Sequence, residues 1–214
     1  LCKIVGHPGT SCDAPDSTAR RFIDRLPHIR HALDLDAQAI FDGDPAAIST
    51  DEVILAYPGF HAIACYRIGH ELHQLGAELA ARMVTESAHR VTGIDIHPAA
   101  EIGPSFAIDH GTGIVIGATA VLGAHVKLYQ GVTLGALSVE KHMASSKRHP
   151  TIGDRVVIYA NATILGGDTK IGDGSIIGGN VWLTQSVPPK TVITPTARVD
   201  RARGPGEDVI EFNI

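Results

Sequence analysis

An aspartate and a histidine in the middle of the chain have the types and the spacing of an acid–base pair. Asp95 stands fifteen residues before His110. If one coil of a repeating fold takes about eighteen residues, the two can stack on neighbouring coils at one edge, where a carboxylate can hydrogen-bond an imidazole. Such a bond fixes the imidazole tautomer and raises the basicity of the free nitrogen, as a general base requires. The alternative is a surface Asp and His brought together by chance.

The other histidines carry different signals. His70 and His73 could share a metal ion from one helix turn, but no thiol or carboxylate clearly completes a site. A solvated or packed helix face is therefore the better interpretation of that pair. Arg148-His149-Pro150, by contrast, lies in a polar stretch that lacks any repeat. This segment is the second candidate for chemistry.

A six-residue period must position these side chains. Aliphatic residues recur every six positions, as in the series Ile96, Ile102, Ile108, Ile114, Ala120, Val126 and Val132. Six residues make one short strand and a turn, and three such units close a triangular coil whose apolar side chains stack inside. The pattern predicts a left-handed parallel β-helix of hexapeptide repeats.

The residues before the repeats have helical spacing. Ser17-Thr18 could cap a helix that Pro27 stops or kinks, and Ser49 could cap another. We therefore expect an α+β chain with an N-terminal α-helical domain (1–93) and a β-helix catalytic domain (94–193). A loop (136–149) would leave the β-helix, and a flexible C-terminal tail (194–214) would follow it.

Composition limits the classes of function. The chain has 214 residues, 23 glycines, a formal charge of −5 and 5% aromatic residues. Few rings and many glycines suit a narrow, repetitive interior. The lack of a basic surplus argues against nucleic acid as a partner, and no apolar run is long enough to span a membrane. Three scattered cysteines without a CxxC pair favour a reduced, cytoplasmic protein with no disulfide framework and no metal.

Several segments, taken in order, resemble the serine O-acetyltransferase family. They are Asp44-Pro45-Ala46, Gly59-Phe60-His61-Ala62, Tyr66-Arg67-Ile68-Gly69-His70, Asp95-Ile96-His97-Pro98, Asp109-His110-Gly111-Thr112-Gly113, Gln130-Gly131-Val132-Thr133-Leu134-Gly135 and Arg148-His149-Pro150. The resemblance covers roughly residues 44–190. It implies acetyl transfer from acetyl-CoA to the hydroxyl of L-serine, giving O-acetyl-L-serine and CoA, the first step of cysteine biosynthesis from serine. Residues 1–43 have no clear match.

The resemblance also assigns roles to single residues. It makes His110 the base that removes the serine hydroxyl proton, with Asp95 as its orienting partner. Asp44 and Asp109 would hold the ammonium group of serine, and Arg148 its carboxylate.

Two further assignments follow from the resemblance. His149 would contact the substrate or stabilise the tetrahedral oxyanion, and both roles remain open. Acetyl-CoA would be a co-substrate, with no permanently bound cofactor. Its pantetheine arm would lie between adjacent β-helices of a homotrimer, or of a dimer of trimers, against the small residues Gly135, Ala160 and Gly178.

The family resemblance also implies partners. Relatives that form the cysteine synthase complex end in a short tail with a terminal Ile, and Asn213-Ile214 resembles it. Ile214 would then enter the active site of O-acetylserine sulfhydrylase, whereas the alternative is a disordered terminus. Feedback inhibition by L-cysteine at the serine site is a further expectation.

Three alternatives stay open on sequence grounds. A hexapeptide acyltransferase for a sugar or antibiotic hydroxyl would share the β-helix and a catalytic His, without needing the Asp and Arg set. A trimeric metal-dependent carbonic anhydrase would need three histidines converging between subunits, for instance His125, His142 and His149. A non-catalytic scaffold would leave the spacing of Asp95 and His110 unexplained.

Overall fold

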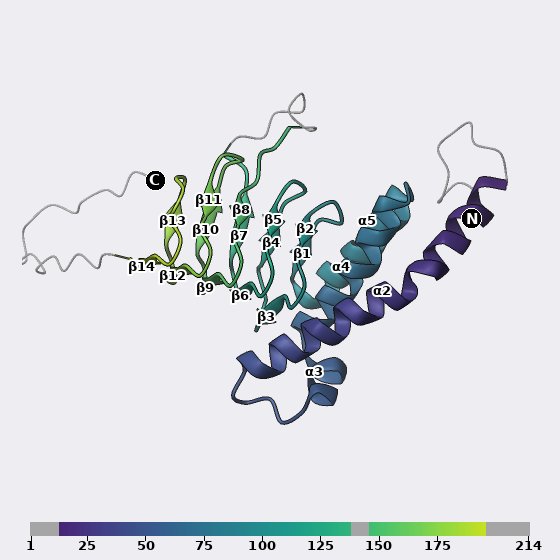
Figure 1. The fold of residues 1–214 in the computed structure, drawn as a ribbon, viewed down its shortest axis with the longest axis horizontal. Helices are drawn as coiled ribbons and strands as arrows, with labels where there is room; N and C mark the ends of the chain where they lie inside the picture. The colour runs from purple at the N-terminus through teal and green to yellow at the C-terminus, as the bar shows by residue number, and fades with distance from the viewer. Residues whose placement is uncertain (1–12, 138–145, 196–214) are drawn as a thin grey trace, which may run out of the picture.

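The structure is a computed structural model that describes residues 13–137 and 146–195, with side chains from Ser17 onward. Within these residues, four helices lie at one end of a row of stacked coils made of short parallel strands (Figure 1). No described helix is long and apolar enough to cross a membrane. The central part of the expected loop and the whole segment 196–214, with Ile214, lie outside the described residues.

The helices begin and end where local chemistry allows. They are α2 (Asp13–Gly43), α3 (Thr50–Ala56), α4 (Pro58–Gln74) and α5 (Glu78–Thr92). The Ser49 hydroxyl caps α3 by accepting the Glu52 amide at 3.1 Å. Pro58 is the first residue of α4, a position that needs no amide donor. Gly93 ends α5 in the left-handed conformation, with φ of 70°.

Pro27 does not stop a helix, so that part of the expectation is wrong. It lies inside α2, which continues to Gly43. Proline removes one hydrogen bond and crowds the preceding turn. The helix continues past Pro27 because its later turns bury Ile29, Ala37 and Ile40.

The predicted β-helix is confirmed, and its strands form three parallel sheets that are the faces of a prism. Face A is β1-β4-β7-β10-β13, face B is β2-β5-β8-β11, and face C is β3-β6-β9-β12-β14. The strands are β1 (Asp95–Ile96), β2 (Glu101–Ile102), β3 (Ala107–Asp109), β4 (Val115–Ile116), β5 (Val121–Leu122), β6 (Lys127–Tyr129), β7 (Thr133–Gly135), β8 (Thr151–Ile152), β9 (Val157–Ile158), β10 (Thr163–Leu165), β11 (Lys170–Ile171), β12 (Ile176–Ile177), β13 (Trp182–Leu183) and β14 (Val192–Ile193).

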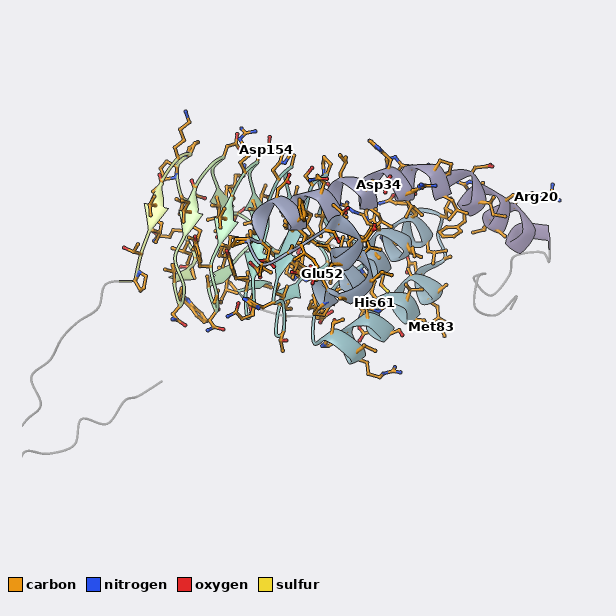
Figure 2. The ribbon with its side chains drawn as sticks, turned by 90° about the horizontal axis from the view of Figure 1, so that it is seen from below. Arg20, Asp34, Glu52, His61, Met83 and Asp154 are labelled. Atoms are coloured by element: carbon orange, nitrogen blue, oxygen red, sulfur yellow. The ribbon has the colours of Figure 1, made fainter. Side chains whose placement is uncertain are left out.

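The interior of the coils is aliphatic, as the six-residue period predicts. Stacked residues such as Ile96, Ile116, Leu134 and Ile164 are buried and register-paired along face A. One continuous apolar cluster extends from the helices into the last coils. Figure 2 shows the elongated body that results, with Arg20 near the far end of α2 and Asp154 on the rim of the coils.

A buried ion pair joins the helices to the first coil. Asp36 of α2 is fully buried and binds Arg67 of α4 through both carboxylate oxygens, at 2.9 and 3.0 Å. The same guanidinium donates to the carbonyls of Ile102 and Gly103 at 2.6 and 2.7 Å, and Asp36 accepts the Phe106 amide at 2.8 Å. Burial raises the pKa of Asp36 above its ordinary value, against the opposing effect of Arg67.

Replacing Arg67 should therefore destabilise the fold strongly. Arg67→Met leaves the buried Asp36 carboxylate without its cation, and we expect a loss of about 3–5 kcal/mol in the free energy of unfolding. Chemical denaturation at neutral pH measures it. The control Arg82→Met breaks the exposed pair with Glu86 and should cost less than about 1 kcal/mol. Similar small losses for both variants would contradict the prediction.

Candidate active site

His110 lies in a corner that is longer than the corresponding corner of the next coil. Asp95 pairs with Val115, twenty residues later, whereas Val115 pairs with Thr133, only eighteen residues later. The two extra residues lie where the first coil turns from face C to face A, which we call corner CA. They push His110 outward, with φ of 59° and a side chain that is 73% exposed. An imidazole presented in this way can meet a substrate from solvent.

Glycine makes this corner possible. Gly111 follows His110 with φ of 94°, and a Cβ at this position would lie 2.5 Å from Ile94 Cδ1. Any other residue would clash with the core and adopt an unfavourable backbone conformation. The side chain of His110 can thus point into solvent because Gly111, its neighbour, has no side chain.

A small cavity beside His110 brings together Asp44 and Asp109, which are far apart in the sequence. Its lining residues are Ile40, Asp44, Tyr57, Ala107, Ile108, Asp109 and Lys127. Asp109 Oδ1 lies 3.5 Å from His110 Nε2. Two carboxylates therefore line one small cavity, contributed by β3 and the segment after α2, and the imidazole of His110 lies next to one of them.

Asp44 is held in its ionised form. Its Oδ2 accepts the Tyr57 hydroxyl at 2.7 Å, and its Oδ1 accepts the Ala46 amide at 2.9 Å. The Tyr57 bond is the largest cause that lowers the pKa of Asp44, followed by the Ala46 amide, with smaller effects of Lys127 and His110. The same bond raises the pKa of Tyr57 to about 12. Tyr57 thus donates to an ionised carboxylate throughout the neutral range.

Lys127 is a site residue that the sequence reasoning missed. Its Nζ lies 2.9 Å from Asp109 Oδ2 and 2.7 Å from the Gly43 carbonyl, at the C-terminus of α2. The last turn of α2 contains no basic residue, so Lys127 supplies the cation that favours this helix end. It also lies over the Tyr129 ring, 4.6 Å from the centroid. The only signal in the sequence is a lysine in an outward position of a repeat.

A second cluster forms where the coil turns from face A to face B, which we call corner AB. His149 is buried there, and its Nδ1 lies 2.8 Å from the Thr119 hydroxyl oxygen and 3.1 Å from the Thr119 amide nitrogen. Burial lowers the pKa of His149 to about 4, with further effects of Arg148 and Lys147. The ring is therefore neutral at physiological pH and cannot act as a cation.

One chain does not bring the two clusters together. Corner CA precedes β4 and corner AB follows it, so face A separates His110 from Arg148 and His149. A Cβ on Gly117, directly after β4, would lie 2.1 Å from His149 Nε2, which places this ring on corner AB. His125 lies at the remaining corner, between faces B and C, and His142 is outside the described residues.

Asp95 lies at the start of β1, close to α5. Donor atoms of Asp95, Glu86 and His89 lie within 4.8 Å of one another, and Glu86 also pairs with Arg82. These are metal-ligating residue types, although the Arg82 guanidinium opposes a cation there. Among the described contacts, none joins Asp95 to His110. The Gly113 amide donates to the Gly93 carbonyl at 2.8 Å, so the segments that contain Asp95 and His110 lie at one edge of the coils. A direct contact between Asp95 and His110 stays a prediction.

The three residues predicted to contact acetyl-CoA lie on later coils than His110. Gly135 ends β7, and a Cβ there would lie 2.8 Å from Leu165 Cδ2. Ala160 and Gly178 follow β9 and β12, on the same edge as His110. Their backbones are used in the stack, since the Ala160 carbonyl accepts the Asn180 amide at 2.9 Å and the Gly178 amide donates to Ile193 at 2.7 Å.

Comparison with known proteins gives concordant matches. A model of the serine acetyltransferase N-terminal region matches residues 1–65. The plasmid serine acetyltransferase of Synechococcus elongatus is 53% identical over 81% of this chain, which spans only 56% of that relative's length. The serine acetyltransferase of Mycobacterium tuberculosis is 49% identical over 74% of this chain and 67% of its own length.

Solved structures agree in fold. Serine acetyltransferase isoform 3 of Entamoeba histolytica, in complex with cysteine, superposes with a TM-score of 0.82 at 40% identity, over 90% of this chain and 67% of that one. The Neisseria gonorrhoeae serine acetyltransferase, in complex with serine, gives a TM-score of 0.76 at 35% identity, over 91% of this chain and 78% of that one.

The electrostatics of the cavity can be tested at Tyr57. In Tyr57→Phe the Asp44 carboxylate loses the hydrogen bond that lowers its pKa most, so that pKa should rise toward its ordinary value. A lowered pKa stabilises the fold above the unfolded-state pKa, and that stability is lost as the pH falls through the folded-state pKa. In the variant this pH-dependent stability should therefore be smaller, and its loss should be complete at a higher pH. Carboxyl carbon NMR titration measures the pKa. Tyr159→Phe, outside the cavity, should leave it unchanged, and an unchanged Asp44 in Tyr57→Phe would refute the assignment.

Proposed function

The chain belongs to the serine acetyltransferase family of acyltransferases, and we propose that it transfers the acetyl group of acetyl-CoA to the hydroxyl of L-serine. The observation that carries this proposal is the placement of an exposed imidazole beside a cavity with two carboxylates. An amino acid with a side-chain hydroxyl fits such a site, since its ammonium needs anions and its hydroxyl needs a base.

The charges of the cavity match one ammonium group. Asp44 and Asp109 contribute two negative charges, and Lys127 neutralises one of them through its contact with Asp109. The remaining negative charge suits a single ammonium, which can donate to carboxylate oxygens. Apart from Asp44, Asp109 and Lys127, the residues that line the cavity are uncharged, and Ile40 and Ile108 form aliphatic walls. The lining therefore offers no further charged group to a larger polar substrate.

His110 would act as the base. Its free ring nitrogen takes the serine hydroxyl proton while the hydroxyl oxygen attacks the thioester carbonyl carbon. The resulting tetrahedral intermediate collapses with cleavage of the carbon–sulfur bond, and the imidazolium returns the proton to the thiolate of CoA. Asp109, at 3.5 Å, stabilises the imidazolium formed in between. Asp95, on the same edge, would orient the ring.

The carboxylate of serine requires a second chain. Arg148 and His149 lie at corner AB, across face A from His110, so the two halves of the site could meet only where corner CA of one chain approaches corner AB of another. We therefore propose a homotrimer with sites between subunits, alone or as a dimer of trimers. The pantetheine arm would lie along the same interface, against Gly135, Ala160 and Gly178.

The runner-up functions lack specific support here. A sugar or antibiotic acceptor would not need the ammonium cavity of Asp44 and Asp109. A metal-dependent carbonic anhydrase would need His125 and His149 to converge between subunits. His125 lies at the corner between faces B and C, outside the proposed interface of corners CA and AB, and the His149 Nδ1 already accepts hydrogen bonds from Thr119.

Serine-dependent thiol release from acetyl-CoA tests the function. We expect release with L-serine but not with a galactoside, and a loss of about 10²–10⁴-fold in kcat for His110→Ala, the range of general-base catalysis. His125→Ala is the matched control, because His125 is also exposed and left-handed, with φ of 58°. No serine-dependent release, or full activity of His110→Ala, would overturn the proposal.

L-Cysteine should compete with serine. It has the same ammonium and carboxylate, with a thiol in place of the hydroxyl, and the Entamoeba relative is described in complex with cysteine. We expect cysteine to raise the apparent KM for serine without changing kcat, as measured by initial rates at several serine concentrations. Inhibition that serine cannot overcome would place cysteine elsewhere.

A further inference from the structure

Thr119 is the centre of the cluster at corner AB. Its hydroxyl oxygen accepts the amides of Arg148 and His149, at 3.0 and 3.1 Å. Its carbonyl accepts Lys147 Nζ at 2.5 Å, and its own amide donates to His149 Nδ1 at 3.1 Å. Every polar group of Thr119 thus makes a hydrogen bond with one of residues 147–149, the segment by which the chain returns to the coil.

These contacts determine the tautomer of His149. A backbone amide can only donate, so the His149 Nδ1 that receives the Thr119 amide must carry a lone pair. The Thr119 hydroxyl already accepts two amides, and its remaining proton is directed to the same Nδ1, at 2.8 Å. Since burial keeps the ring neutral, with a pKa of about 4, the single ring proton is on Nε2.

The Nε2–H group is left for a ligand. None of the hydrogen bonds among the described residues uses Nε2, which lies over Gly117, where a Cβ would approach it to 2.1 Å. A buried ring with one nitrogen fully committed and the other unused is arranged to donate outward. Such a donor can bind an oxygen of a bound molecule in place of water.

We propose that Thr119 is a positioning residue that holds His149 as a neutral Nε2–H donor to an anionic oxygen of the substrates. The inference rests on the proposed function and deepens it. A ring protonated on Nε2, with Nδ1 engaged, cannot take the proton of the serine hydroxyl. The two histidines then have separate tasks, with His110 as the base and His149 as the donor to the serine carboxylate or the oxyanion.

The first test reads the tautomer without any substrate. In the purified oligomer labelled with ¹⁵N-histidine, the His149 ring should show an unprotonated Nδ1 and a protonated Nε2, unchanged down to about pH 5 because its pKa is about 4. The His149→Gln variant assigns the signal. In Thr119→Val, which removes the hydroxyl but keeps the side-chain shape and the backbone amide, the Nδ1 resonance should shift because it loses one of its two hydrogen bonds, and the pKa should rise. Thr119→Ser should restore the original spectrum.

The second test reads the kinetic consequence. Thr119→Val should raise the KM for serine or lower kcat by about tenfold, the effect of losing a hydrogen bond to a charged group, while the KM for acetyl-CoA stays unchanged. Thr119→Ser should recover most of the activity. Thr151→Val, which alters a hydroxyl two residues after His149, is the control and should behave like the unmodified protein.

The outcomes separate this inference from the proposed function. A wild-type spectrum with Nδ1 protonated would overturn the tautomer assignment whatever the enzyme does, and an Nδ1 resonance unchanged in Thr119→Val would overturn the role of the Thr119 hydroxyl. The expected spectra with unchanged kinetics in Thr119→Val would overturn the positioning role. The expected spectra in a protein that releases no thiol with serine would refute the proposed function and leave the tautomer assignment intact.

Discussion

The ion pair between Asp36 and Arg67 is the constraint on which the geometry of the site depends. It lies between α2, α4 and the first coil, and it satisfies the carbonyls of Ile102 and Gly103 and the amide of Phe106. A buried carboxylate without this partner would be costly, so the three elements are held in one arrangement. That arrangement determines where β3 ends, and hence where Asp109 and His110 lie, relative to the end of α2.

The cavity proposed to hold the ammonium group depends on the same ion pair. Asp44 is the first residue after α2, and Lys127 binds both the end of that helix and Asp109. The Tyr57 hydroxyl, from the short connection between α3 and α4, keeps Asp44 ionised. Four segments that are distant in the sequence therefore produce one electrostatic environment, in which each anion already has a cation or a donor nearby and one negative charge remains.

The proposed mechanism divides a zwitterionic substrate between two corners of the prism. Carboxylates gather at corner CA, whereas Arg148 and the neutral ring of His149 lie at corner AB. Separating the two prevents Arg148 from pairing with Asp44 or Asp109 within one chain, which would quench the site. Under the proposed trimer, the complementary charges meet only when the subunits assemble, so assembly and substrate recognition are coupled.

The sequence by itself determined the β-helix, because a six-residue period has no other regular solution in which aliphatic side chains share one interior. It also indicated His110, Asp109 and Asp44 as candidates, and the structure places Asp44 and Asp109 in one cavity, with His110 3.5 Å from Asp109. It could not show that the first coil has two extra residues at corner CA, since Ile108 and Ile114 keep the six-residue spacing across the insertion. Only the tertiary structure decided the parts played by Lys127, Tyr57 and Thr119, because a lysine, a tyrosine or a threonine acquires such a role from neighbours that are distant in sequence. For the same reason, the spacing between Asp95 and His110 could not show that Asp95 lies beside Glu86 and His89.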